Sequence, residues 1–254
     1  MNAAPFDAAT AAFVGSHEEG CQRLQSDTIE LLGVITSASN GTMLCRLGDT
    51  ADNLFAIYKP GQHERPLWDF PGRLFHREVA AYEVSEFLGW GIVPPTVLRD
   101  GPLGPGSLQL FVPHDPVQHY FTLVEDDVWD TALARMAMFD MVINNADRKG
   151  GHVLRSTREE RLYGIDNGLT FHVESKLRTV VWDVPHVSFQ GAWKADLTRL
   201  QQCLRGDEVI RRRLDELLTI AEVQILARRA RHIAGMAAVP DVDPDRRWYP
   251  WPPI

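Results

Sequence analysis

The feature that most constrains the fold of this chain is a pair of polar loops that each carry an aspartate. The first loop covers residues 144–152, Asn-Asn-Ala-Asp-Arg-Lys-Gly-Gly-His, and places Asp147 just after an apolar helical segment. The second contains Asp166, which follows the apolar run 162–165 and lies 19 positions after Asp147. Phosphoryl transfer needs this layout, because one carboxylate orients the attacking group and the other holds a metal on ATP. Taken singly, each aspartate is more typical of an ordinary turn, and only the ordered pair favours a catalytic role.

Composition narrows the class of protein. The 254 residues, 44% hydrophobic and 24% charged, fit one large globular domain or two lobes around a cleft. The net charge of −8 argues against a nucleic-acid-binding protein and gives no general attraction to anionic membranes. No apolar run approaches the roughly 18 residues of a membrane span, and no secretory signal is recognisable. Together with three widely spaced cysteines, which suggest reduced thiols, these features predict a cytoplasmic protein.

Up to about residue 113 the pattern is mainly that of β-strands separated by Gly- and Pro-containing turns. A single amphipathic helix is predicted over residues 76–88. The first 27 residues are polar and weakly periodic, with a short helix suggested over residues 7–13. The predicted strands cover residues 29–35, 43–47, 54–59, 93–98 and 107–112.

After residue 113 the pattern becomes helical. We expect a helix from Asp127 or Asp130 to about residue 143, and mainly helical structure over residues 196–236. Two short strands, 153–154 and 162–165, flank a turn between these helices. The predicted fold class is therefore α+β, with two lobes. The β-rich N-lobe with one helix covers residues 28–113, and the helical C-lobe covers residues 114–254.

Two residues and one loop of the N-lobe are candidates for binding phosphates. Lys59 ends a predicted strand, where it could contact phosphate oxygens, although most lysines simply lie in water. Glu78, on the predicted helix, could pair with Lys59, the alternative being a solvated helix face. Small residues at 37–42, including Ser39 and Asn40, could cover phosphates with their backbone N–H groups.

Six segments of this chain, in their order along the sequence, resemble those of the phosphatidylinositol 3-/4-kinase-like branch of the protein-kinase-like fold. The likeness is greatest to type II phosphatidylinositol 4-kinases and to an actinobacterial family similar to them. It extends over about 115 residues, and it is the ordered set, rather than any one motif, that is specific. The matching segments are residues 58–60, 77–82, 92–96, 106–112, 139–148 and 164–171.

This resemblance implies ATP and either Mg²⁺ or Mn²⁺ as cofactors. Lys59 would contact the ATP phosphates, and Glu78 would position Lys59. Asp147 would be the catalytic-loop aspartate, Arg148 and Lys59 would be catalytic residues with it, and Asp166 would bind the metal. The hinge that holds the adenine would be formed by Leu110, Phe111 and Val112.

His152 departs from the pattern of such kinases, which usually place a metal-binding Asn five residues after the catalytic Asp. His152 could bind a metal such as Mn²⁺, contact phosphate directly, or mark the loss of a second metal site. The sequence therefore leaves two functions open. One is an ATP-dependent phosphotransferase acting on a hydroxyl of a lipid, protein or small molecule. The other is a nucleotide-binding pseudokinase that serves as a regulatory or scaffold module with a protein partner.

Overall fold

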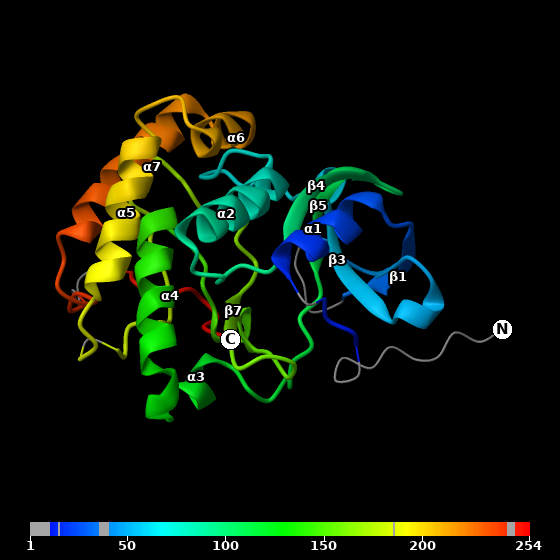
Figure 1. Ribbon diagram of the computed structural model, residues 1–254, viewed down its shortest axis with the longest axis horizontal. Helices are drawn as coiled ribbons and strands as arrows, with labels where there is room; N and C mark the ends of the chain where they lie inside the picture. The colour runs from blue at the N-terminus through cyan, green and yellow to red at the C-terminus, as the bar shows by residue number, and fades with distance from the viewer. Residues whose placement is uncertain (1–10, 15, 36–40, 185, 243–246) are drawn as a thin grey trace.

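A five-stranded antiparallel sheet and a group of helices form the two halves of the molecule, which Figure 1 shows side by side. The computed structural model describes residues 11–14, 16–35, 41–184, 186–242 and 247–254. The sheet is built from the first part of the chain and the main helices from the second, so the predicted α+β class is confirmed.

The sheet has the strand order β1-β2-β3-β5-β4, and each pair of neighbours is antiparallel. Its strand β2 has the predicted bounds, but the β4–β5 hairpin is tighter than predicted. Pro94 and Pro95 lack the N–H groups that a strand needs, and Gly104, at φ 83°, closes a two-residue turn. The strands are β1 (Ile29–Val34), β2 (Met43–Leu47), β3 (Leu54–Pro60), β4 (Thr96–Gly101) and β5 (Gly104–Leu110).

One helix in the first part of the chain was not predicted. Helix α1 (His17–Ser26) packs against β4 and β5, and Leu24 is its main contribution to the core of the sheet. Ser16 caps this helix by accepting a hydrogen bond from the backbone N–H of Glu19 at 3.1 Å. The helix suggested over residues 7–13 lies mostly outside the described residues, and residues 11–14 are not helical.

Helix α2 (Leu74–Leu88) lies between the sheet and the C-terminal helices. It contacts β4 and β5 on one side and α5 and α6 on the other. Buried positions therefore surround the helix, which explains why it lacks a wide polar face. Gly89 ends it in a left-handed conformation with φ 69°. Residues on α2 can thus reach both halves of the molecule.

In its described residues, the second half contains five helices and a two-stranded sheet of β6 and β7. Helix α4 ends where predicted, and Asn144 terminates it in a left-handed conformation with φ 55°. The helical stretch predicted over residues 196–236 is three separate helices and begins five residues earlier, at Gly191. The elements are α3 (Tyr120–Leu123), α4 (Asp130–Ile143), α5 (Gly191–Cys203), α6 (Val209–Leu217), α7 (Ile220–Ala234), β6 (Val153–Arg155) and β7 (Leu162–Gly164). Four single 3₁₀ turns are η1 (Thr50–Asp52), η2 (Gly61–His63), η3 (Asp127–Trp129) and η4 (Gly150–His152).

The irregular tail at residues 247–254 lies against the loop that follows α4. The ring of Trp248 meets that of Trp182 edge to face, with 5.5 Å between centroids. The carbonyl of Pro253 accepts the backbone N–H of Gly150 at 2.8 Å. Within the described ranges, no helix is long and apolar enough to cross a membrane.

Candidate active site

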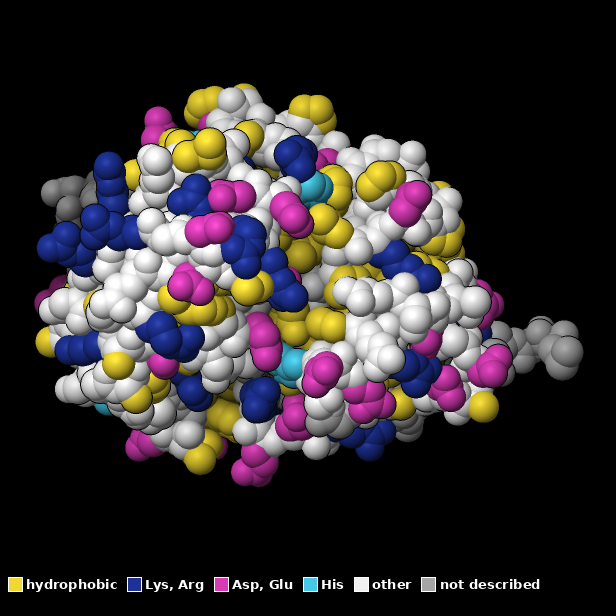
Figure 2. Space-filling model, turned by 45° about the horizontal axis from the view of Figure 1, so that its top comes forward, with side chains coloured by type: hydrophobic (Ala, Val, Ile, Leu, Met, Phe, Trp, Pro, Cys, Tyr) yellow, Lys and Arg dark blue, Asp and Glu magenta, His cyan; other side chains and the backbone are white. Residues whose placement is uncertain are grey.

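Three charged side chains from distant parts of the chain meet between the two halves. Lys59, near the end of β3, contacts Glu78 on α2 and lies 2.6 Å from Oδ1 of Asp166, which follows β7. Glu78 is only 3% exposed, and its second oxygen accepts the backbone N–H of Asn167 at 2.8 Å. The space-filling view in Figure 2 shows hydrophobic side chains deep between the halves, with charges of both signs around them.

Lys59 and the two carboxylates beside it stabilise each other's charges, whereas the two carboxylates repel one another. Burial opposes the charged form of Lys59, but the carboxylates of Asp166 and Glu78 outweigh it and hold the lysine pKa above its usual range. Burial likewise opposes ionisation of Asp166, yet Lys59 and then His152 hold its pKa well below the usual range. Both Lys59 and Asp166 are therefore charged at neutral pH.

The backbone presents Asp166 to the cleft. This residue has a left-handed conformation with φ 58°, which Asp adopts more readily than most other residues. Its side chain is 47% exposed, in contrast to the buried Glu78 on the other side of Lys59. Uncommon backbone conformations of this kind are concentrated at ligand sites. One carboxylate thus anchors the lysine from inside, and the other faces solvent.

His152, in η4, contacts both aspartates. Its Nε2 is 3.3 Å from Oδ2 of Asp166, and its Nδ1 is 3.1 Å from the carbonyl oxygen of Asp147. Burial lowers the pKa of His152 to about 4, although Asp166 opposes this shift, so the ring is neutral at pH 7. With the proton on Nε2, the ring donates a hydrogen bond to Asp166 and Nδ1 accepts the N–H of Lys149 at 3.3 Å. With the proton on Nδ1, the ring donates to the carbonyl of Asp147 instead, and only this tautomer leaves Nε2 free as a metal ligand.

Asp147 combines partial burial with a rigid backbone. Its N–H donates to Oδ1 of Asn145 at 2.9 Å, and Nζ of Lys149 lies 3.5 Å from its carboxylate. Burial raises the pKa of Asp147 to about 6, with the ammonium of Lys149 opposing the shift. The group is mostly ionised at neutral pH and is more basic than an ordinary aspartate, as a proton acceptor should be.

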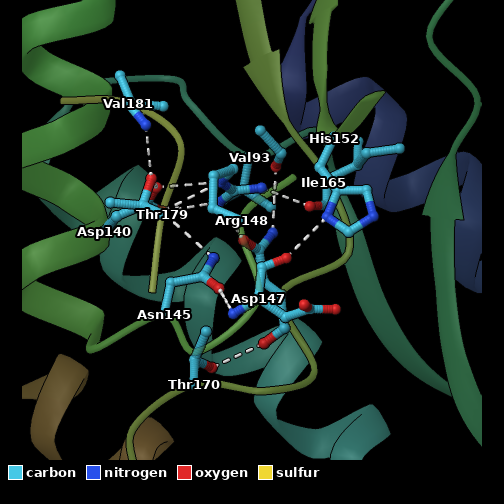
Figure 3. A network of polar contacts seen from close by, with 12 residues as sticks. Val93, Asp140, Asn145, Asp147, Arg148, His152, Ile165, Thr170, Thr179 and Val181 are labelled. Atoms are coloured by element: carbon cyan, nitrogen blue, oxygen red, sulfur yellow. Dashed lines mark hydrogen bonds and ion pairs between the residues drawn. The ribbon is translucent and has the colours of Figure 1, made fainter. Parts of the chain in front are cut away.

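Arg148 points away from the cleft into a buried network (Figure 3). Its guanidinium and the carboxylate of Asp140, on α4, are both 0% exposed, and Nη2 lies 3.0 Å from Oδ1. Asp140 also accepts bonds from Asn145 at 3.2 Å and from Thr179 at 3.0 Å. A buried carboxylate with this many donors can remain charged.

The same guanidinium connects the two aspartate loops. It donates to the carbonyl of Ile165 and, at 2.7 Å, to the side chain of Asn167, the two residues on either side of Asp166. Arg148 therefore fixes the loop of Asp147 relative to that of Asp166. Direct contact between Arg148 and a substrate does not fit this complete burial.

An apolar surface lies beside Lys59. Residues of β3 alternate between faces, so Ile57 shares the face of Lys59 and packs with Leu32 and Leu44 from the neighbouring strands. Phe111 belongs to the same cluster. These aliphatic side chains are only partly buried and offer a flat apolar surface of the kind that an adenine ring requires.

The predicted hinge residues follow this surface. Leu110 is the last residue of β5, so Phe111 and Val112 lie beyond the strand that was predicted to contain them. Phe111 donates its N–H to the carbonyl of Phe55 at 3.0 Å, and the carbonyl of Val112 lies 2.7 Å from Nδ1 of His114. Ser39 and Asn40, the predicted phosphate-covering residues, lie outside the described residues.

Sequence reasoning missed Asp140, Asn145 and Lys149 as parts of this site. Lys149 directly follows the Asp147-Arg148 pair, so its position in the motif was a usable signal. Asp140 and Asn145 carry no such signal, because the one lies within a helix and the other in a loop of polar residues. Their roles follow only from contacts in the structure, those of Asp140 with Arg148 and of Asn145 with Asp140 and the N–H of Asp147.

The described residues could supply only part of a metal shell. No group of three or more His, Cys, Asp or Glu side chains in this portion of the chain could hold a metal on its own. Asp166 offers an exposed carboxylate, and His152 offers a neutral ring nitrogen next to it. Nucleotide phosphates and water would have to complete the shell, as Mg²⁺ sites on nucleotides commonly require. The mixture of oxygen and nitrogen donors also suits Mn²⁺.

Comparison with solved structures identifies the class of fold. The chain has the protein-kinase-like fold of the Golgi casein kinase, with a TM-score of 0.58 over 89% of this chain and 75% of the other at 12% identity. The structure of the Golgi casein kinase with Mn/ADP bound gives a TM-score of 0.54, again at 12% identity, over 86% and 74% of the two chains.

A curated relative shows the family. The chain belongs to the family of Protein Rv2133c from Mycobacterium tuberculosis (strain ATCC 25618 / H37Rv). The two are 38% identical over an alignment of 263 residues, which covers 90% of this chain and 93% of the relative. No family model matches the chain.

Proposed function

We propose that this protein is an ATP-dependent phosphotransferase that moves the γ-phosphate of ATP to a hydroxyl group. The observation that carries the proposal is Lys59, held between a buried Glu78 and an exposed Asp166. Kinases need a lysine fixed by a glutamate, together with an aspartate that holds the metal. Here the buried Glu78 is suited to fixing the lysine, and the exposed Asp166 is suited to holding a metal.

In this proposal, the adenine, the phosphates and the metal would each contact a different group of residues. The adenine would lie on the apolar surface of Leu32, Leu44 and Ile57, with the hinge at Leu110–Val112 along its edge. Lys59 would then bind phosphate oxygens, because it is the cation at the end of that surface. Asp166 and His152 would hold Mg²⁺ or Mn²⁺, which would neutralise charge on the phosphates.

Asp147 would accept the proton of the acceptor hydroxyl. The hydroxyl oxygen forms a bond to the γ-phosphorus, the bond from that phosphorus to the β–γ bridging oxygen breaks, and ADP leaves. The hydroxyl proton passes to the carboxylate of Asp147. Lys149, 3.5 Å from this carboxylate, is placed to stabilise the negative charge on the transferred group.

Arg148 acts in this proposal as a positioning residue. Its buried guanidinium fixes the spacing of Asp147 and Asp166 through Asp140, Ile165 and Asn167. Catalytic groups must be held within a fraction of an ångström of their productive geometry. A role through these neighbours therefore replaces the direct role that the sequence suggested for Arg148.

The second candidate function is a nucleotide-binding pseudokinase, and His152 is the observation that favours it. The ring is neutral, partly buried and 3.3 Å from Asp166, in the position where related kinases place a metal-binding Asn. Turnover that rises in His152→Asn would indicate a degraded site and favour the pseudokinase. Turnover that falls would mean that the histidine is a working ligand.

The kinase subfamily and the chemical class of the phosphate acceptor are also part of the proposal. The resemblance to phosphatidylinositol 3-/4-kinases supports a division into lobes at residues 28–113 and 114–254. The neighbouring structure with Mn/ADP bound supports testing Mn²⁺ beside Mg²⁺. The acceptor can be a lipid, a protein or a small molecule, and a cytoplasmic location follows the sequence expectation.

Release of ADP from ATP, with and without candidate acceptors, tests the proposal. We expect turnover in the wild type with Mg²⁺ or Mn²⁺ and a loss of at least about 100-fold in Asp147→Asn, as is usual when a general base is removed. Asp166→Ala should lose both turnover and metal-dependent nucleotide binding. Arg228→Gln, on the exposed side of α7, is the matched control. Equal rates in the control and in both aspartate variants would exclude this site as the source of activity.

A further inference from the structure

A segment after Phe171 runs alongside the loop that carries Asp147, and Arg178 is its point of closest attachment. The N–H of Arg178 donates to the carbonyl of Asn145 at 2.8 Å, and its carbonyl accepts the N–H of Arg148 at 3.1 Å. These two bonds lie on either side of Asp147 in the chain. The side chain of Arg178 therefore starts directly beside the proposed proton acceptor.

The other cations around Asp147 already have partners. Lys149 pairs with Asp147 itself at 3.5 Å, and Lys176 pairs with Asp69 at 3.1 Å. Lys59 is held by its two carboxylates. In the described part of the chain, by contrast, no carboxylate lies within ion-pair distance of the guanidinium of Arg178. This side chain is only partly buried, so a ligand can reach it.

The charge of Arg178 acts on two aspartates. The pKa of Asp69 is lowered mainly by its hydrogen bond with Lys176, and Arg178 adds to that effect. Burial raises the pKa of Asp147, and Arg178 acts with Lys149 against the shift. Arg178 is thus close enough to influence both Asp147 and Asp69, which lies in the loop before α2.

An unpaired guanidinium at this place is suited to a particular kind of ligand. Arginine binds phosphate and carboxylate groups through two parallel hydrogen bonds, which gives orientation as well as affinity. Two carboxylates, Asp69 and Asp147, experience the charge of Arg178, and the whole chain carries −8. Such surroundings disfavour a large polyanion and leave room for one anionic group.

We propose that Arg178 binds an anionic group on the phosphate acceptor, so that the acceptor is a hydroxyl compound with a phosphate or carboxylate near its reacting hydroxyl. This inference rests on the proposed phosphotransferase function, because it requires Asp147 to face the acceptor. It adds the recognition element that Lys59, Asp166 and Asp147 do not supply. The hydroxyl would lie at Asp147, and the anionic group would lie at Arg178.

The test uses glycerol 3-phosphate as a probe and glycerol as its uncharged counterpart. The protein is first saturated with a non-hydrolysable ATP analogue and Mg²⁺, so that the nucleotide phosphate site is filled. Apparent affinities are then measured by thermal unfolding for the wild type, Arg178→Gln, Arg178→Lys and the control Arg228→Gln. Vesicles containing phosphatidylglycerol, which has the same head group on a lipid, form a second arm.

We expect the wild type and the Arg228→Gln control to bind glycerol 3-phosphate at least about tenfold more tightly than glycerol, as a charge-assisted bidentate contact implies. Arg178→Gln should lose this preference, and Arg178→Lys should keep part of it. Dependence on Arg178 that appears with the soluble probe points to a small molecule, and dependence confined to vesicles points to a lipid head group.

The outcomes separate this inference from the proposed function. If the ATP analogue stabilises the wild type and Arg178→Gln equally, the nucleotide site and the fold of the variant are intact. An anion preference that is absent in both arms, or that persists in Arg178→Gln, then overturns the inference alone. If the analogue fails to stabilise the wild type, the proposed function itself is wrong.

Discussion

Replacing Asp140 by Ala should be among the most destabilising single changes in this protein. The substitution leaves the guanidinium of Arg148, which is 0% exposed, without its counter-ion. Breaking a buried ion pair from one side costs about 3–5 kcal/mol, because the remaining charge is left uncompensated. In a chain of this size about 1 kcal/mol lowers Tm by ~2–4 °C, so a fall of about 10 °C is expected.

The assay is urea unfolding followed by circular dichroism, with thermal unfolding as a second probe. In the double variant Asp140→Ala/Arg148→Met the unpaired charge is removed, so its destabilisation should be smaller than the sum of the two single effects. ATP affinity should also fall in Asp140→Ala, since Arg148 fixes the loop around Asp166. A loss of stability below about 1 kcal/mol would refute the reasoning, because surface substitutions have effects of that size.

Three further predictions concern strand packing, pH and thiol reactivity. A Cβ at Gly106 would lie 2.5 Å from the carbonyl oxygen of Lys59. Gly106→Ala should therefore lower the free energy of unfolding in urea by about 1–3 kcal/mol and weaken ATP binding. An unchanged unfolding midpoint would contradict this. Burial, aided by Arg73, lowers the pKa of His76 to about 4, whereas the same histidine in the unfolded chain titrates near 6.5. The free energy of unfolding should therefore fall as pH drops from 6.5 towards 4, and it should fall less in His76→Asn. Burial raises the pKa of the fully buried Cys45 to about 12, so a thiol reagent should label Cys45 only after unfolding, unlike the partly buried Cys21 and Cys203. Peptide mapping that finds rapid labelling of Cys45 in the native protein would contradict its burial.

Local patterns in the sequence were sufficient for several elements of both halves. The segment 43–47 between two turns predicted β2 with its correct bounds, and apolar spacing predicted most of α2, although buried positions surround that helix. Helix α1 was missed because only Gly20 and Leu24 are buried in it. Its signal was the Ser-x-x-Glu pattern that begins at Ser16, which is typical of a helix N-terminus.

The contacts that build the site are long-range and leave little trace in local patterns. Lys59 and Asp166 are 107 positions apart, and only their order in a kinase-like motif suggested that they belong together. Nothing around Arg77 indicates that it pairs with Glu222, 145 positions later, and joins α2 to α7. The sequence also gives no sign that Arg148 points into the interior, because this direction depends on its ion pair with Asp140 on α4.

Thermal unfolding with ATP and Mg²⁺ or Mn²⁺, in the wild type and in Asp166→Ala, tests the central claim most directly. A ligand that binds only the native state adds about 2.7 kcal/mol of stability at 100 times its dissociation constant. The account predicts a metal-dependent rise in Tm of about 5 °C or more in the wild type and its loss in the variant. No rise at millimolar ATP, or the same rise in both proteins, would contradict a nucleotide site built on Lys59 and Asp166.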